Sequence, residues 1–222
     1  MWKLKTHFIF WMMRGESFMS KEKIIEGLII EPNQFPRRLK IDNELSALQK
    51  AVKGYIECID LPNGATLICN EEGKINDEPL NRILYDEYGE KTDVIAGTFI
   101  AVGFNDDGEF TSLTLEQYED ITQQFFCPDM FFQVNNEIHM VNTDWQINLI
   151  DDNEITFTDN KTGEIKDTII CDDDIEQIRI CSFINGIRSE IFRGMSLDNS
   201  AIEIHTDQDP ITPYFDIYDE ER

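Results

Sequence analysis

The chain has 222 residues, enough for one large domain or two small ones, and its 41% hydrophobic and 11% aromatic residues are typical of a globular protein. Its 44 acidic and 19 basic side chains give a net charge of −25. Nucleic acids and anionic membranes bind basic surfaces, so this charge argues against both as direct partners and favours basic protein surfaces, cations or a small ligand.

The N-terminal residues 1–22 are predicted to be a flexible or spurious extension. The apolar run at residues 8–13 is too short to span a bilayer, and Arg14-Gly15-Glu16 ends it without the small-residue cleavage site of a signal peptide. Met19-Ser20-Lys21 would serve as an ordinary start. We therefore expect the fold to begin at Lys23.

Residues 23–128 are predicted to form an α+β domain. β-Branched and apolar runs between turn residues predict strands at 24–31, 37–41, 55–61 and 65–69. The first two form a hairpin between Pro32 and Pro36, and Asn63-Gly64 is the hairpin turn between the last two. Leucines and small residues at helical spacing predict a helix that starts near Asn43 and ends at Gly54 in the left-handed C′ position.

Further along this domain, Pro79 is predicted to start a short helix through Leu84. Residues 93–103 are continuous enough for one central strand, in which Gly97 indicates a bulge or a close backbone approach. Thr114 is predicted to cap a helix that Pro128 stops. The apolar stripe of that helix is Leu115, Tyr118, Ile121, Phe125 and Phe126.

Residues 132–222 are predicted to form a second, β-rich and acidic domain. Eight basic and 21 acidic side chains give residues 24–131 a net −13, and six and 21 give residues 132–222 a net −15, so the acidity is spread over both parts. Alternating apolar residues predict strands at 137–141, 145–150, 154–158, 165–171, 176–183, 188–192 and 201–205. The expected fold class is thus α+β, with a mixed or antiparallel sheet and two to three helices, followed by a β-rich C-terminal part.

The cysteines and histidines argue against a metal site. The five cysteines have no C-x-x-C spacing, and four of them lie in apolar runs, as reduced thiols of a cytoplasmic protein do. Asp172-Asp173-Asp174 with Glu176 resembles a cation-binding run. It lacks the glycine and the distal glutamate of an EF-hand loop, and this absence favours a solvated acidic turn. We expect neither a metal nor a cofactor.

Five blocks of the first domain occur together in a known order: Gly54-Tyr55-Ile56-Glu57, residues 67–74, Pro79-Leu80-Asn81-Arg82, residues 86–89 and residues 93–99. Over roughly residues 24–126 they resemble an uncharacterised domain-of-unknown-function family of phages, plasmids and integrative elements. The resemblance implies a genetic context, in which accessory proteins often counter host defence, and it implies no catalytic role for any residue.

The polar residues of these blocks are the candidate ligand site. Arg82 offers a bidentate fork for a carboxylate or phosphate, and two asparagines can read an amide or base edge. The alternative is that Arg82 pairs with Glu71 or Asp86 and fixes a turn. The predicted site consists of Asn70, Glu71, Asn81, Arg82, Asp86 and Thr98.

Three functions follow as hypotheses. The leading one is a non-enzymatic accessory protein of a mobile element or phage, an anti-restriction or anti-CRISPR inhibitor that mimics DNA with carboxylates and binds the basic surface of a host defence nuclease or nucleic-acid-binding protein. The second is a sponge or sensor for a small anionic ligand or nucleotide centred on Arg82. The third is an enzyme of unknown type, which is disfavoured because the chain has no G-x-S-x-G, Walker A or H-E-x-x-H motif.

Overall fold

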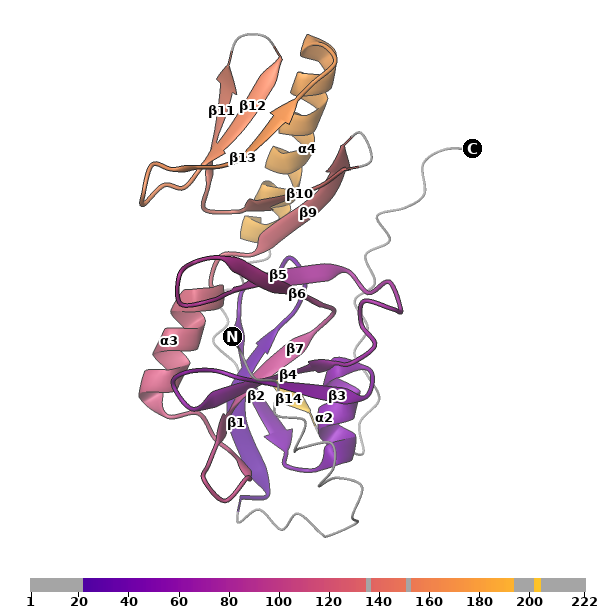
Figure 1. Cartoon of the computed structure of the whole chain (residues 1–222). Coiled ribbons are helices and arrows are strands. Elements are labelled where there is room, and N and C mark those ends of the chain that lie inside the picture. Colours follow the sequence, from indigo (N-terminus) through magenta and orange to yellow (C-terminus); the bar gives the residue numbers. More distant parts are fainter. Residues whose placement is uncertain (1–21, 135–136, 151–152, 194–201, 205–222) are drawn as a thin grey trace.

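Figure 1 shows the computed structural model, which describes residues 22–134, 137–150, 153–193 and 202–204. All of the predicted extension except Glu22 lies outside these residues. The described residues form an α+β fold with three helices and mostly antiparallel strands, as the sequence predicts.

The main sheet has the strand order β14-β2-β1-β7-β4-β3, with β8 paired to β7. Neighbouring strands are antiparallel except β14, which runs parallel to β2. The strands are β1 (Ile24–Ile30), β2 (Arg37–Asp42), β3 (Ile56–Asp60), β4 (Ala65–Asn70), β7 (Phe99–Phe104), β8 (Phe110–Thr111) and β14 (Ile202–Ile204). The two predicted hairpins, β1–β2 and β3–β4, are confirmed.

Two helices cover opposite faces of the main sheet (Figure 1). α2 (Leu45–Val52) packs on Ile25 and Ile29 of β1, whereas α3 (Leu115–Phe125) packs on the opposite side chains of the same strand, Leu28 and Ile30. α3 starts at the predicted Thr114, whose side chain forms a capping box with Gln117.

The end of α2 differs from the prediction. Lys53, with a φ of 61°, takes the left-handed position that was predicted for Gly54. A glycine is needed at position 54 for a steric reason, because a Cβ at this residue would lie 2.2 Å from Asn70 Oδ1. The glycine therefore makes room for a polar side chain of β4.

A hairpin of β5 (Leu80–Tyr85) and β6 (Lys91–Ala96) lies between the main sheet and the C-terminal part (Figure 1). The short helix predicted after Pro79 is wrong. Both faces of β5 are covered, since Leu84 packs in the core with α3 and Ile83 packs in the C-terminal core. A strand buried on both faces loses its alternating pattern, which explains the helical reading.

The single strand predicted at residues 93–103 is in fact two strands, β6 and β7, separated by Gly97 and Thr98. Gly97 has a φ of 76°, and a Cβ there would lie 1.7 Å from Glu78 Oε2. The close approach predicted at this glycine is therefore present, but it turns the chain from one layer into the next.

The C-terminal part contains a hairpin, a three-stranded antiparallel sheet and one long helix. The hairpin is β9 (Asp129–Val134) with β10 (Glu137–Asn142). The sheet is β11 (Gln146–Ile150), β12 (Glu154–Thr158) and β13 (Ile165–Ile170), and the helix is α4 (Asp174–Arg193). Ile155 and Phe157 of β12 face α4 residues Ile184 and Ile191 in one core.

Two strands predicted in this part, 176–183 and 188–192, are wrong, because both lie within α4. Their alternation arises from apolar residues on opposite sides of one helix: Ile178 is exposed, whereas Ile180 packs against the core. The strand predicted at 201–205 is present as β14, but it joins the main sheet beside β2 rather than the C-terminal sheet.

The acidic run before α4 is a helix cap. Asp173 Oδ1 accepts a hydrogen bond from the Glu176 N–H at 2.8 Å, and Glu176 Oε2 accepts one from the Asp172 N–H at 2.6 Å. The Asp173 bond satisfies a backbone N–H of the first helical turn, as an N-cap side chain does, and the Glu176 bond holds the residue before it. The run therefore starts a helix instead of forming a simple acidic turn.

Replacing Asp173 by alanine is expected to lower the free energy of unfolding by about 1 kcal/mol, since it removes the acceptor for the first turn of α4. Urea unfolding followed by circular dichroism measures the change. Asp107→Ala, which removes the same charge from an exposed turn, is the control and should unfold like the wild type. Equal midpoints for the two variants would contradict the role of Asp173 as a cap.

Candidate functional site

Arg82, the centre of the predicted ligand site, lies in β5 and is buried, with 1% of its surface exposed. Its Nε donates to the Phe125 carbonyl at 3.3 Å, and Nη2 donates to the same carbonyl at 3.2 Å and to the Gln34 carbonyl at 2.7 Å. Its Nη1 donates to the Asn81 carbonyl at 3.2 Å and to Asn81 Oδ1 at 2.9 Å. These bonds use all five N–H groups of a guanidinium.

The charge of Arg82 is retained despite burial. Desolvation lowers the pKa of Arg82 to about 10, and the nearby carboxylate of Asp129 opposes that shift. The guanidinium is therefore positive at neutral pH and holds together three segments that are far apart in sequence: the loop after β1, strand β5 and the end of α3. A ligand would have to displace these bonds to reach it.

Asn81 continues this network. Its side chain is fully buried, and Nδ2 donates to the carbonyls of Ile30 at 3.0 Å and Gly97 at 2.7 Å. It thereby joins the end of β1 to the turn between β6 and β7, where Thr98 is also buried. Asn81, Arg82 and Thr98 are thus brought to one region, which is filled by protein.

Asn70 lies in a second, neighbouring network. Its Nδ2 donates to Glu78 Oε1 at 2.5 Å and its Oδ1 accepts from the Glu72 N–H at 3.0 Å. The same Glu78 side chain lies against Gly97. Asn70 therefore fixes the loop between β4 and β5 to the turn between β6 and β7.

The two predicted carboxylates lie apart from Arg82. Glu71 is exposed, and its backbone N–H donates to the Tyr55 carbonyl at 2.8 Å. Asp86 accepts the backbone N–H groups of Tyr88 and Glu90, both at 2.9 Å, and so closes the β5–β6 turn. Neither carboxylate pairs with Arg82, whose five donors are used elsewhere among the described residues.

Asp129 is the carboxylate whose charge raises the pKa of Arg82. Sequence reasoning did not single it out. Asp129 is 4% exposed, and it accepts the Ile83 N–H at 3.0 Å and Asn142 Nδ2 at 2.7 Å. It therefore fastens β9 and β10 of the C-terminal part to β5. The sequence signal was an acidic residue directly after Pro128 and before an apolar strand.

Asp129 gives stability a specific pH dependence. Burial raises its pKa above the usual value, against the opposing effects of its hydrogen bonds and of Arg82. A raised pKa in the folded state favours the protonated form, so the contribution of this residue is fully present below pH about 4, the pKa in the unfolded chain, and is lost as pH rises through the folded pKa.

The stability difference between the wild type and Asp129→Asn is therefore expected to fall as pH rises from about 4. Urea unfolding of both proteins across the acidic to neutral range measures it. The comparison cancels the other carboxyl groups, which the two proteins share. A difference that grows with pH would mean that the folded state instead prefers the charged carboxylate.

The thiols offer no reactive centre. The cysteines among the described residues are free, and burial raises the pKa of Cys58 and of Cys69 to about 12. A thiol with such a pKa is protonated at neutral pH and is a poor nucleophile. No group of three or more metal-ligating side chains occurs in the described part of the chain.

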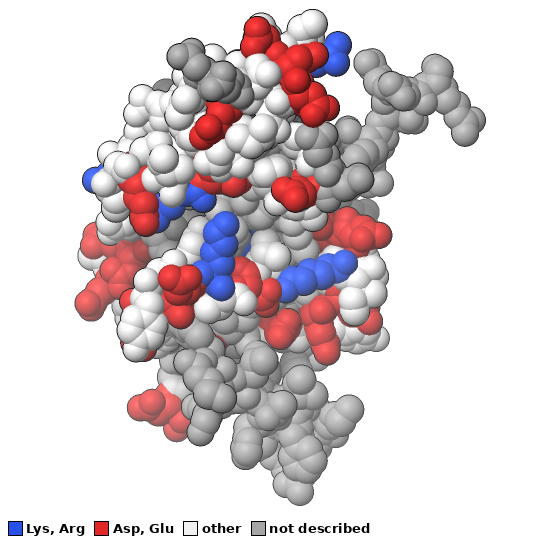
Figure 2. All heavy atoms as spheres, turned by 45° about the horizontal axis from the view of Figure 1, so that its top comes forward, with Lys and Arg blue, Asp and Glu red and all other residues white. Residues whose placement is uncertain are grey.

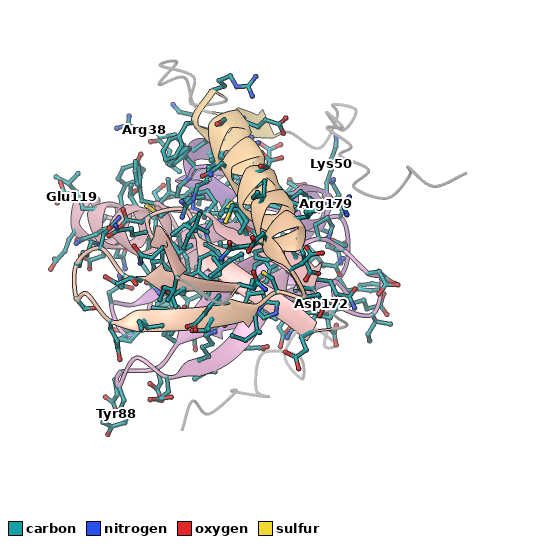
Figure 3. The ribbon with its side chains drawn as sticks, turned by 90° about the horizontal axis from the view of Figure 1, so that it is seen from above. Arg38, Lys50, Tyr88, Glu119, Asp172 and Arg179 are labelled. Carbon is teal, nitrogen blue, oxygen red and sulfur yellow. The ribbon has the colours of Figure 1, made fainter. Side chains whose placement is uncertain are left out.

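Acidic side chains dominate the outside of the protein instead. In Figure 2, Asp and Glu side chains are spread over the upper and the lower half of the face that is shown. α3 is the clearest case, because its 11 residues include three exposed acidic side chains and no basic one. Glu119 points away from the molecule in Figure 3. The three are Glu116, Glu119 and Asp120.

The acidic face of α3 is held rigidly. Ile121 and Phe125 anchor the helix in the core, and the capping box fixes its start. Gln117 Nε2 donates to the Asn63 carbonyl at 3.1 Å, and Asn63 Nδ2 donates to Asp120 Oδ2 at 3.4 Å, so the β3–β4 turn lies beside it. The helix backbone that carries these carboxylates is therefore fixed relative to the main sheet.

No helix among the described residues is both long and apolar enough to cross a membrane. Comparison with curated proteins and with solved structures found no match to this chain. Residues 25–126, which contain the main-sheet strands from β1 to β8, both covering helices and the Arg82 network, match one protein family. The family is described as domain of unknown function (DUF3846), and this part of the chain is similar to it.

Proposed function

We propose that the protein is a non-enzymatic binding protein whose acidic surface occupies a basic, nucleic-acid-binding surface of another protein. The observation that carries the proposal is the net charge of −25, borne by side chains on rigid elements such as α3. Oppositely charged surfaces steer association and set specificity. A protein channel that binds DNA phosphates is a surface of the required charge.

The genetic context implied by the family resemblance refines this proposal. In a mobile element or phage, a cytoplasmic protein of this kind would act as an anti-defence inhibitor, a DNA mimic that blocks a restriction or CRISPR nuclease. The alternative of a small anionic ligand at Arg82 has weaker support, because all five N–H groups of that guanidinium are used by the protein itself.

Competition with DNA tests the proposal. Labelled duplex DNA is bound to each member of a panel of purified restriction and CRISPR nucleases, and the protein is added as competitor. We expect it to displace DNA from at least one nuclease. The triple variant Glu116→Lys, Glu119→Lys, Asp120→Lys should compete at least about tenfold less well, since each reversal turns attraction into repulsion.

A charge-matched variant separates the face of α3 from overall charge. Glu87→Lys, Glu90→Lys, Asp107→Lys changes the net charge equally, but at exposed turns outside α3. It should retain more competition than the α3 variant. Failure of the wild type to displace DNA from every nuclease of the panel would count against DNA mimicry of these defence types.

A further inference from the structure

α4 carries apolar residues on two sides. The fold uses the inner side along the helix, and it uses the outer side only near the C-terminal end, where the Phe192 ring lies 5.9 Å from the ring of Phe35. The inner side consists of buried Ile184 and Ile191, with Ile180 and Ile187 packed beside them, and it faces the sheet of the C-terminal part. The outer side also carries uncharged residues at intervals of three and four: Ile175, Ile178, Ser182, Asn185, Ser189 and Phe192. We call these six residues the outer stripe.

The outer stripe is exposed along the whole helix. All six residues are in contact with solvent, and Ile175, Ile178 and Phe192 are 60%, 61% and 52% exposed. Figure 3 shows α4 from above, lying across the outside of the C-terminal part, with Asp172 near its first turn. The spacing is that of the a and d positions of a heptad, which form the seam between two paired helices.

The charge of α4 points to a second copy as the occupant of this seam. The helix carries three acidic residues (Asp174, Glu176 and Glu190) and three basic ones (Arg179, Arg188 and Arg193), so its net charge is zero in a chain of −25. Two strongly acidic copies repel each other over most of their surface. A neutral helix with an apolar stripe is a face on which they can meet.

The distribution of charge along α4 favours an antiparallel pair. The first turn and the residues before it are acidic (Asp172, Asp173, Asp174 and Glu176), whereas Arg193 ends the helix. Parallel helices would place one acidic end on the other. An antiparallel pair places each acidic N-terminus beside the basic C-terminus of its partner. The two helix dipoles then point in opposite directions, which is the favourable arrangement for neighbouring dipoles.

The outer stripe is self-complementary in this orientation. With the two-fold axis between Ser182 and Asn185, Ile175 of one copy lies level with the partner's Phe192. Ile178 lies level with the partner's Ser189, and Ser182 with the partner's Asn185. The large side chains then pack at the ends, and the small polar ones allow close approach and a hydrogen bond at the centre, which fixes the register.

We propose that the protein forms a homodimer through antiparallel pairing of the outer stripes of α4. The proposal is independent of the proposed function, because it uses a neutral helix on the C-terminal part and none of the carboxylates of α3. It implies that each dimer presents two acidic faces to its partners.

Sedimentation equilibrium of the full chain over a wide concentration range tests the proposal. We expect a monomer–dimer equilibrium that salt strengthens, because screening weakens the repulsion between the acidic copies. Ile178→Asp should weaken association at least about tenfold, since it places a carboxylate in an apolar seam on each copy. Asn185→Ile should strengthen association by replacing a polar layer with an apolar one.

Ile170→Asp is the matched control. Ile170 is an isoleucine of β13 that is 62% exposed, as Ile178 is 61% exposed, and it lies outside the stripe. This variant should dimerise like the wild type. A wild type that stays monomeric at all concentrations would overturn the proposal, as would a dimer that Ile178→Asp and Ile170→Asp weaken equally. A mixed complex with another helical protein in place of the dimer would also overturn it.

Discussion

Arg82→Met is expected to lower the free energy of unfolding by about 3 to 5 kcal/mol, because it removes a buried charge on which other buried groups depend. Methionine fills a similar volume but donates nothing. The carbonyls of Gln34 and Phe125 would lose their donors, and the carboxylate of Asp129 would lose its nearby positive charge. Chemical unfolding in urea or guanidinium measures the loss.

Two further arginine variants make this test specific. Arg82→Lys keeps the charge but supplies three donors in place of five, so it should recover only part of the lost stability. Arg38→Ala removes an exposed arginine that lies over the Tyr118 ring, and it should stay close to the wild type. A stable Arg82→Met protein would show that the network is not structural and would restore Arg82 as a ligand-binding candidate.

Phe125→Ala is expected to cost about 3 to 5 kcal/mol of unfolding free energy, which is the usual range for a buried phenylalanine. The Phe125 side chain is 2% exposed and meets the ring of Phe99 edge to face at 5.3 Å. Its removal leaves a cavity between α3 and the main sheet. Urea unfolding at neutral pH gives the change.

The neighbouring Phe126 is the natural control. It is 43% exposed and contacts Phe35 at a centroid distance of 5.0 Å. Phe126→Ala should cost about 1 kcal/mol, well below the loss at Phe125. Similar losses at the two positions would contradict the orientation of α3 on the sheet.

Local sequence signals predicted several elements of the first domain. The Asn63-Gly64 turn, the Thr114 cap and the β-branched runs of β1 to β4 each depend on neighbours within a few residues, and each has its predicted structure. Burial within the α3 stripe was less predictable. Leu115 and Phe126 fit the apolar spacing but are 74% and 43% exposed, because at 3.6 residues per turn they lie to one side of the face that buries Ile121 and Phe125.

The errors have a common physical cause in elements with apolar residues on two sides. β5 is covered on both faces by different cores, and α4 has one side in the core and the outer stripe in water. In neither case does periodicity indicate one buried face. Asp173 and Glu176, which were interpreted from the sequence as part of a solvated acidic turn, were the local signal for the start of α4.

The sequence grouped Asn70 with Asn81 and Arg82, which lie in neighbouring networks, but it could not identify their partners. The hydrogen bonds of Arg82 go to backbone carbonyls 43 and 48 residues away, and any residue type supplies a carbonyl. An arginine bound by backbone carbonyls and one amide side chain leaves no pattern of carboxylates in the sequence. This is why a saturated structural arginine resembles a ligand-binding one.

The salt dependence of inhibition tests the central claim most directly. The affinity of the protein for a nuclease from which it displaces DNA is measured from about 50 mM to about 300 mM NaCl, a range over which the Debye length shrinks substantially. Binding through an acidic surface predicts a steep loss of affinity with salt, and a smaller slope for the triple α3 variant. An affinity that stays constant over this range would contradict the account.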